Sequence, residues 1–140
     1  MWGITGGYQG FHNPDFPPTL LTNESVENIH HDGGTVLRIS RGGFDADKIL
    51  KFLRDYEISQ LYIIGGDGTH RGAYAIHQAC MEANMNVAVA GIPKTIDNDL
   101  DFLDRSFGFL SAVEAAQASI RSAKTEAQCT PNAVGIVKLM

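Results

Sequence analysis

The sequence predicts an α/β fold in which a doubly wound parallel sheet carries helices on both faces. Short apolar runs typical of buried strands alternate with segments whose apolar residues recur at the helical period. The connections are short and rich in glycine, of which the chain has 15. Apolar residues make up 44% of the 140 residues and charged residues 19%, a composition that excludes a disordered chain. We expect residues 1–140 to form a single, partial domain.

The negative net charge of the chain argues against nucleic acid and anionic membranes as partners. Eleven Lys and Arg against 16 Asp and Glu give a formal charge of −5, the wrong sign for binding nucleic acid or an anionic membrane. No apolar stretch approaches the roughly 18 residues of a membrane span, and the N-terminus lacks a signal-peptide pattern. Cys80 and Cys129 show neither metal-ligand nor disulfide-scaffold spacing, which fits a reducing, cytoplasmic location. Because the net charge is negative, a bound phosphate group would have to be held by the residues immediately around it.

The first half of the chain predicts two helices separated by a strand. A short helix is expected over residues 25–31, with Asn23 as its N-cap. Residues 35–39 are typical of a strand. Asp45 is a good N-cap for a second helix that should end near Tyr56, because the apolar residues between them follow the helical period.

The second half predicts strands that alternate with helices. Leu61–Ile64 is a continuous apolar run, the pattern of a strand buried on both faces of a parallel sheet. A helix is expected from a cap at Thr69 to about Asn84. A strand, a polar loop, a helix and a terminal strand should follow over residues 87–92, 93–107, 111–127 and 134–140. In such folds ligands bind outside the carboxyl ends of the strands.

The segment Gly65–Thr69 follows a predicted strand and combines three glycines with a carboxylate. Glycines let backbone N–H groups approach phosphate oxygens, and the N-terminus of the next helix favours anions. Beside a polyphosphate Asp67 would need an intervening cation, and Mg²⁺ prefers such oxygen ligands. We therefore take Gly66, Asp67, Gly68 and Thr69 as candidate phosphate and metal residues. An ordinary Gly-rich turn with Asp67 as a cap explains the spacing equally well.

The segment Gly91–Asp99 also follows a predicted strand. If it is extended, Thr95, Asp97 and Asp99 point to one side. Two carboxylates beside a hydroxyl can orient a substrate alcohol and accept its proton, as phosphoryl transfer requires. An Asx-rich turn that bonds its own backbone is the alternative. Arg41 is either a phosphate ligand or a surface residue, and we assign the histidines no chemistry.

Taken together, the motifs resemble the phosphofructokinase family along nearly the whole chain, most closely its plant-type ATP-dependent 6-phosphofructokinases. The segments that carry the resemblance occur in the family's order: 33–35, 40–43, 65–69, 93–99, 107–109 and 137–140. NAD kinases and lipid kinases share something like the Gly-rich segment. The segment Pro93–Asp99 distinguishes this chain from them.

The resemblance implies transfer of the γ-phosphoryl group of MgATP to the 1-hydroxyl of fructose 6-phosphate in glycolysis, by a homo-oligomer that is a tetramer in the family. It also implies roles for individual residues. Asp67 would lie near Mg²⁺ and the transferred group, and Arg41 near the nucleotide phosphates. Thr95 would lie near the phosphate and the sugar, with Asp97 as base and Asp99 supporting it. The resemblance adds Lys94 and Met140 to the substrate-binding residues.

Two alternatives stay open: a pyrophosphate-dependent enzyme with the same acceptor, and a truncated product without catalysis. In the resembling pyrophosphate enzymes an Asp usually replaces Gly68, so this glycine favours ATP, whereas Lys94 weakly favours pyrophosphate. Arg38 and Leu110 depart from the family's usual Gly and Asp.

The resemblance also implies that the chain is an incomplete N-terminal domain. The family's nucleotide loop would precede Met1, and further sugar-binding residues would follow Met140. We therefore expect the chain by itself to lack activity, and a plastid location stays open because a transit peptide would lie upstream.

Overall fold

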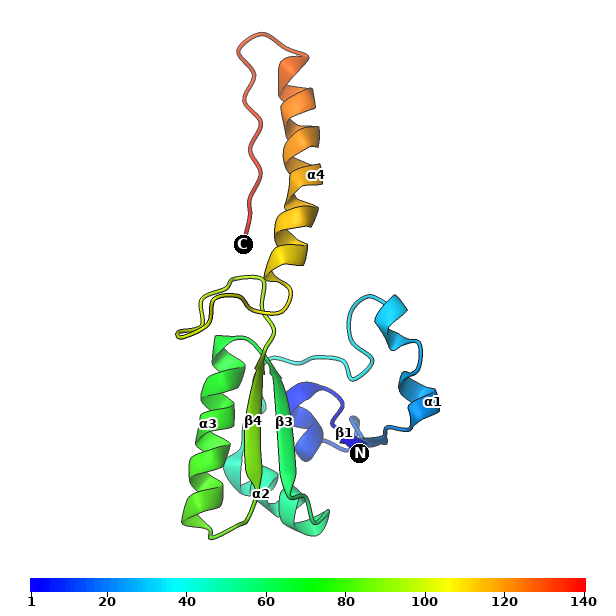
Figure 1. Ribbon diagram of the computed structural model, residues 1–140, viewed down its shortest axis with the longest axis vertical. Helices are drawn as coiled ribbons and strands as arrows, with labels where there is room; N and C mark the ends of the chain where they lie inside the picture. The colour runs from blue at the N-terminus through cyan, green and yellow to red at the C-terminus, as the bar shows by residue number, and fades with distance from the viewer. The chain divides into compact units, whose positions relative to one another are not determined.

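The computed structural model describes residues 1–140 and confirms an alternation of helices and strands (Figure 1). In chain order the elements are β1 (Trp2–Gly3), the 3-10 helix η1 (Gly7–Phe11), β2 (Thr19–Leu20), α1 (Asn23–Val26), the 3-10 helix η2 (Ile29–His31), α2 (Ala46–Asp55), β3 (Gln60–Gly65), α3 (Asp67–Glu82), β4 (Ala88–Pro93) and α4 (Phe109–Gln128). No helix combines the length and the apolar character needed to cross a membrane.

The chain divides into two compact units. The first unit comprises Met1–Leu61 and Gly72–Val89, and the second comprises Tyr62–Arg71 and Ala90–Met140. The boundary passes through β3, α3 and β4, so the carboxyl ends of both strands belong to the second unit together with the first turn of α3.

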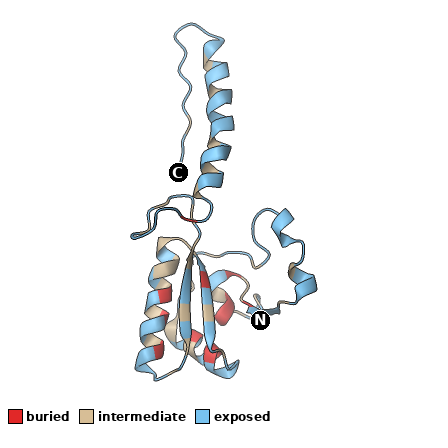
Figure 2. Cartoon of the chain, in the orientation of Figure 1, coloured by how far each residue is buried: buried red, intermediate tan, exposed pale blue.

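Helix α2 confirms its prediction at both ends. The Asp45 carboxylate accepts the N–H of Lys48 at 3.2 Å, and Tyr56 is the C-cap. Its apolar face is buried, and the ring of Phe52 meets that of Phe11 edge to face at 5.2 Å. Figure 2 shows buried residues in η1, α2 and α3, which supply the core of the first unit.

The N-terminal region differs from its prediction in two places. The expected helix over 25–31 is divided into α1 and η2, and Thr22 rather than Asn23 is the N-cap, because Thr22 Oγ1 accepts the N–H of Ser25 at 3.2 Å. The strand predicted over 35–39 is wrong. Thr35 accepts the N–H of Arg38 in a turn, and Arg38 takes φ 59, a left-handed conformation incompatible with a strand.

Strands β3 and β4 form a two-stranded parallel sheet. The N–H of Ala88 donates to Ser59 at 2.9 Å and that of Lys94 donates to Gly65 at 2.9 Å, so partners advance together along both strands. The bounds of both strands match the prediction closely. Burial on both faces is wrong: Ile63 is 8% exposed, whereas Ile64 is 58% exposed, so one face of β3 lacks cover.

The carboxyl-terminal part of the second unit consists of a long helix and a returning segment. Helix α4 contains the predicted 111–127 but has no buried residue (Figure 2). The strand predicted over 134–140 is wrong, because that segment lies beside α4 instead of pairing with a strand (Figure 1). A Cβ on Gly135 would lie only 2.7 Å from the carbonyl oxygen of Ala123, which shows how closely the two run.

Candidate functional site

The Gly-rich turn, Gly65–Thr69, joins β3 to α3. Helix α3 begins at Asp67, so Thr69 lies inside its first turn and the prediction of Thr69 as a cap is wrong. The carbonyl of Gly66 accepts two hydrogen bonds from His70, one from its backbone N–H at 3.0 Å and one from Nδ1 at 2.9 Å. The turn is therefore held from within the helix that follows it.

The glycines of this turn have different surroundings: Gly65 is closely packed, whereas Gly68 faces open space. A Cβ on Gly65 would come within 2.5 Å of Thr69 Oγ1, so this position has no room for a side chain. A Cβ on Gly68 would meet nothing within 4 Å. The first N–H groups of a helix have no acceptor within it, and the dipole of the helix adds partial positive charge. The start of α3 thus offers an anion an approach that no side chain of Gly68 obstructs.

Asp67 lies at this helix start and forms an ion pair with Arg71, one turn later. Its side chain is 46% exposed, so it is accessible to a cation from solvent. No group of three or more His, Cys, Asp or Glu side chains converges to enclose a metal. A magnesium ion at Asp67 would accordingly take one protein carboxylate and fill its other positions with phosphate oxygens and water, which is the usual mode for this ion. The donor set fits Mg²⁺ in that form.

The carboxylate loop, Pro93–Phe107, closes on itself at its base. The N–H of Thr95 donates to Phe107 at 3.0 Å, and the N–H of Phe107 donates to Pro93 at 2.8 Å. Lys94, the residue after β4, forms an isolated parallel bridge with Phe107. These bonds hold together the two ends of the loop at the carboxyl end of β4. The candidate base, Asp97, lies within this loop.

Within the loop, Asp97 forms local hydrogen bonds with Thr95 and is also accessible to solvent. The Thr95 hydroxyl accepts the N–H of Asp97 at 3.1 Å and donates to Asp97 Oδ2 at 3.4 Å. Asp97 is exposed, and so is Asp99. The predicted one-sided arrangement assumed an extended backbone, which ends at Asn98 because this residue adopts φ 52. Alternation therefore does not place Asp99 beside Thr95.

The two motifs meet at Gly66 and Thr95. A Cβ on Gly66 would lie 3.5 Å from the Cβ of Thr95 and 3.6 Å from its hydroxyl oxygen. The backbone just before the start of α3 thus lies against Thr95, the residue that contacts Asp97. Parallel pairing of β3 and β4 explains the contact, because it brings the two carboxyl ends to the same edge.

The remaining predicted substrate residues lie farther along the second unit. Lys94 is exposed beside Thr95. Met140 lies with Ile96, Phe109 and residues of the first turns of α4 around a hollow of about 270 Å³. The structure thus connects Met140 to the loop through Ile96, the residue before Asp97.

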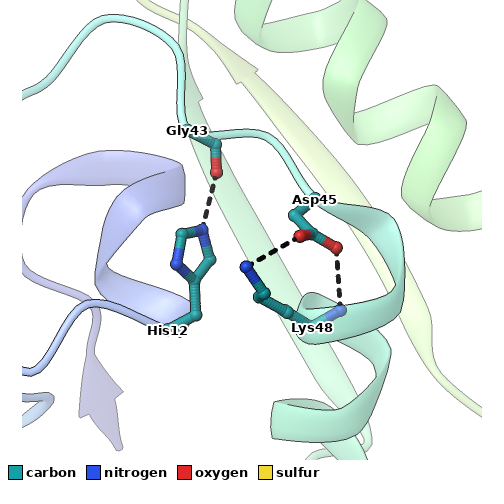
Figure 3. A network of polar contacts seen from close by, with 4 residues as sticks. All are labelled: His12, Gly43, Asp45 and Lys48. Carbon is teal, nitrogen blue, oxygen red and sulfur yellow. Dashed lines mark hydrogen bonds and ion pairs between the residues drawn. The ribbon is translucent and has the colours of Figure 1, made fainter.

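Arg41 belongs to the first unit, where hydrogen bonds anchor the backbone on each side of it, and Figure 3 shows the bond from His12 to Gly43. Ser40 Oγ donates to the carbonyl of Gly6, and His12 Nε2 donates to that of Gly43 at 3.0 Å. Gly43 takes φ 74 and packs so tightly that a Cβ would meet Gln9 Cγ at 2.1 Å. The exposed Arg41 side chain is therefore presented from a fixed turn, and its role toward phosphate stays a prediction.

The helix that follows this turn has a charged cap. The Asp45 carboxylate accepts the N–H of Lys48 and forms an ion pair with its Nζ at 3.1 Å (Figure 3). The backbone hydrogen bond from Lys48, followed by the bond from its side chain, lowers the pKa of Asp45 below its ordinary value. The cap holds the start of α2 immediately after the Arg41 turn.

Three residues to which the sequence assigned no role hold the backbone of the two motifs. His70 was given no chemistry, yet it holds Gly66. Asn98 and Ser106 bond to one another and to the loop backbone. The position of His70 one turn after Gly66 was a usable signal, whereas nothing in the spacing of Ser106 indicated its partner.

A family model described as phosphofructokinase matches residues 1–140. The chain belongs to the phosphofructokinase family. The resemblance inferred from the Gly-rich and acidic segments is thereby confirmed over the whole sequence. A crystal structure of a pyrophosphate-dependent phosphofructokinase from Marinobacter aquaeolei matches 89% of this chain and 32% of its own with a TM-score of 0.76. At 22% identity that likeness shows the fold, which confirms the predicted α/β class.

Curated relatives of this phosphofructokinase chain carry the name ATP-dependent 6-phosphofructokinase. One from Arabidopsis thaliana, number 7, is 50% identical over 138 residues, which are 99% of this chain and 28% of that protein. Another, from Amycolatopsis methanolica, is 48% identical over 120 residues, or 86% of this chain and 26% of that protein. The chain thus spans less than a third of the length of these relatives.

Proposed function

We propose that this chain supplies catalytic residues of an ATP-dependent 6-phosphofructokinase, which transfers the γ-phosphoryl group of MgATP to the 1-hydroxyl of fructose 6-phosphate and gives fructose 1,6-bisphosphate. The observation that carries the proposal is the contact of Gly66 with Thr95. It sets an anion-binding helix start beside a loop with an exposed carboxylate. Phosphoryl transfer needs the helix start and the carboxylate within reach of the same phosphoryl group, because catalysis rests on positioning and charge stabilisation.

The residues divide the work by their chemistry. Backbone N–H groups at the start of α3 would hold phosphate oxygens, and the Asp67 carboxylate would hold Mg²⁺. A bound Mg²⁺ neutralises charge on the transferred group. Thr95 orients the phosphoryl group and the sugar between the two motifs. Asp97 accepts the proton of the 1-hydroxyl, with Asp99 in support.

Three further residues have proposed roles. Arg41 pairs with nucleotide phosphates from its anchored turn. Lys94 and Met140 contact the sugar phosphate. Assembly as a homo-oligomer belongs to the same proposal, as does a cytoplasmic location. Since some relatives are named chloroplastic, a plastid location is the alternative.

ATP is the proposed donor rather than pyrophosphate. The relatives at 45% to 50% identity are named ATP-dependent. The open space at Gly68 also leaves room for a nucleotide beyond the transferred phosphate. The pyrophosphate-dependent structural neighbour, at 22% identity, informs the fold and not the donor.

A chimaera tests this function. This chain replaces the matching stretch of the Arabidopsis relative, and formation of fructose 1,6-bisphosphate is measured with ATP and with pyrophosphate, beside the unaltered relative. We expect the chimaera to use ATP and fructose 6-phosphate, and the 140-residue chain alone to show no turnover. A folded chimaera without turnover, or one that prefers pyrophosphate, would overturn the proposal.

A further inference from the structure

We propose that Asn98 and Ser106 are positioning residues for phosphoryl transfer: together they clamp the carboxylate loop so that Asp97 stays aligned with the acceptor hydroxyl. This inference rests on the proposed function, since it assigns the clamp to the loop of the proposed base. Neither side chain need contact substrate. Their effect passes through Thr95 and the loop backbone.

Asn98 forms one half of the clamp. Its side-chain carbonyl accepts the N–H of Ser106 at 2.8 Å, and its amide donates to the carbonyl of Asp104 at 3.3 Å. It thus connects the two arms of the loop across eight residues. Asn98 also adopts φ 52, a conformation that Asn enters more readily than most residues. Both the backbone and the side chain of this position therefore require an Asn-like residue.

Ser106 forms the other half. It is 7% exposed and is the buried polar residue of the chain. Its hydroxyl donates to the carbonyl of Thr95 at 2.7 Å, while the N–H of Thr95 donates to Phe107 at 3.0 Å. Both the N–H and the carbonyl of Thr95 are therefore hydrogen-bonded, which fixes the backbone position from which the Thr95 side chain extends.

The clamp reaches Asp97 from both sides along the chain. On one side the Thr95 hydroxyl accepts the N–H of Asp97, and on the other Asn98 is the next residue. Asp97 itself is exposed, so packing of its own side chain does not fix it. A base that must face a substrate is held by hydrogen bonds beneath it, and here those bonds lead to Asn98 and Ser106. Displacement of a reacting group by about 1 Å can cost about 10²-fold in rate.

The first experiment measures the clamp without any assay of catalysis. Amide hydrogen exchange is followed at Ser106 and Phe107 in the 140-residue chain and in the Asn98→Gly variant. Glycine accepts the left-handed backbone but lacks the side-chain bonds, so we expect exchange at Ser106 to be at least about tenfold faster. Asn132→Gly is the matched control, because Asn132 has φ 61 and lies exposed outside the loop.

The second experiment measures positioning in the active chimaera. Ser106→Ala removes the hydroxyl that holds Thr95, and we expect kcat to fall by about tenfold to 10²-fold with the KM for ATP nearly unchanged. Ser106→Thr keeps the hydroxyl and should restore most of kcat. Ser122→Ala, which removes a hydroxyl bonded to Ala118 within α4, should leave kcat intact. Asn98→Ala, which also lacks both side-chain bonds, replaces the glycine variant in the exchange measurement if that one does not fold.

The outcomes separate the two proposals. If the unsubstituted chimaera is inactive, the proposed function fails, and amide exchange still tests the clamp. If exchange at Ser106 is unchanged in an Asn98 variant that folds and lacks the side-chain acceptor, the clamp is overturned. If exchange accelerates but kcat stays at its unsubstituted value, the bonds are structural and the positioning role is wrong. Faster exchange together with a kcat loss that Ser106→Thr repairs supports the proposal.

Discussion

The ring of His70 lies directly over Gly91. A Cβ on Gly91 would come within 2.7 Å of His70 Cδ2 and 2.8 Å of Nε2, while Nδ1 of the same ring donates to the carbonyl of Gly66. One imidazole thus connects the first turn of α3, the Gly-rich turn and the middle of β4. The side chain thus contacts both β4 and the turn that follows β3.

This contact predicts non-additive effects on stability. Gly91→Ala should lower the free energy of unfolding by about 1 to 3 kcal/mol, because the added methyl group collides with the ring. His70→Ala in the same chain should recover part of that loss, with a coupling of about 0.5 to 3 kcal/mol between the two positions. Chemical denaturation of the two single variants and the double variant measures the cycle.

Gly33→Ala is the matched control for that cycle, since a Cβ on Gly33 meets nothing within 4 Å. It should change stability little. Additive effects of Gly91→Ala and His70→Ala would show that the ring does not restrain β4.

Gly68 predicts donor choice in the active chimaera. Gly68→Asp places a carboxylate in the open space at the start of α3, where it would repel a nucleotide phosphate beyond the transferred one. We expect the ratio of kcat/KM for ATP to that for pyrophosphate to fall by at least about tenfold. Gly68→Ala adds a methyl group without charge and should keep the preference for ATP. An unchanged ratio in Gly68→Asp would remove this residue from donor selection.

Local signals in the sequence predicted the parts of the fold that depend on neighbouring residues. Asp45 and Tyr56 bound α2 as expected because cap chemistry acts within one helical turn. Leu61–Ile64 and residues 87–92 gave both parallel strands because their apolar runs are short and continuous. Residues 35–39 have a strand-like composition, but the turn bond from Arg38 to Thr35 decides their conformation.

The sequence predicted the motifs of the site but not the residues that hold those motifs in place. Gly66, Asp67 and Asp97 stood out because glycine and carboxylate types carry their own chemistry. The bond from Ser106 to Thr95 spans eleven residues, and the contact of His70 with Gly91 spans two elements. Such contacts follow from how the strand ends meet, which no local spacing encodes.

Tyr8 predicts a loss of stability in alkali. Burial raises the pKa of Tyr8 from 10.0 to about 12, and its ring packs edge to face on Phe44 at 5.4 Å. Below pH 10 the phenol is neutral in both the folded and the unfolded chain, so this group leaves stability unchanged. Between pH 10 and about pH 12 the unfolded chain loses its proton first, and stability should fall.

Denaturation midpoints across that pH range measure the effect. Tyr8→Phe should lose less stability over the range than the unsubstituted chain, because it lacks the titrating group. Tyr74→Phe is the control on an exposed tyrosine and should keep the alkaline loss. Equal slopes for Tyr8→Phe and the unsubstituted chain would contradict the assignment to Tyr8.

Asp67 predicts a defect in the response to Mg²⁺. Asp67→Asn removes the anionic oxygen that the ion prefers and also breaks the ion pair with Arg71. In the active chimaera the Mg²⁺ concentration that gives half-maximal rate should rise, and excess Mg²⁺ should restore part of kcat. Arg71→Gln breaks the same ion pair and keeps the carboxylate, so it controls for that loss. If both variants shift the Mg²⁺ dependence equally, the ion pair and not metal binding is the cause.

Asp97 carries the prediction on proton transfer in the active chimaera. Asp97→Asn keeps the size of the side chain and its contact with the Thr95 hydroxyl but removes the proton acceptor. We expect kcat to fall by about 10² to 10⁴-fold while the KM for fructose 6-phosphate changes little, because the term lost belongs to the transition state. Excess Mg²⁺ should not repair this defect, which separates it from that of Asp67→Asn. Asp101→Asn is the matched control, an exposed aspartate of the same loop, and should leave kcat unchanged. If Asp97→Asn retained the unsubstituted kcat, or if Mg²⁺ alone restored it, Asp97 would not be the base, and Asp99 would be the next carboxylate to test.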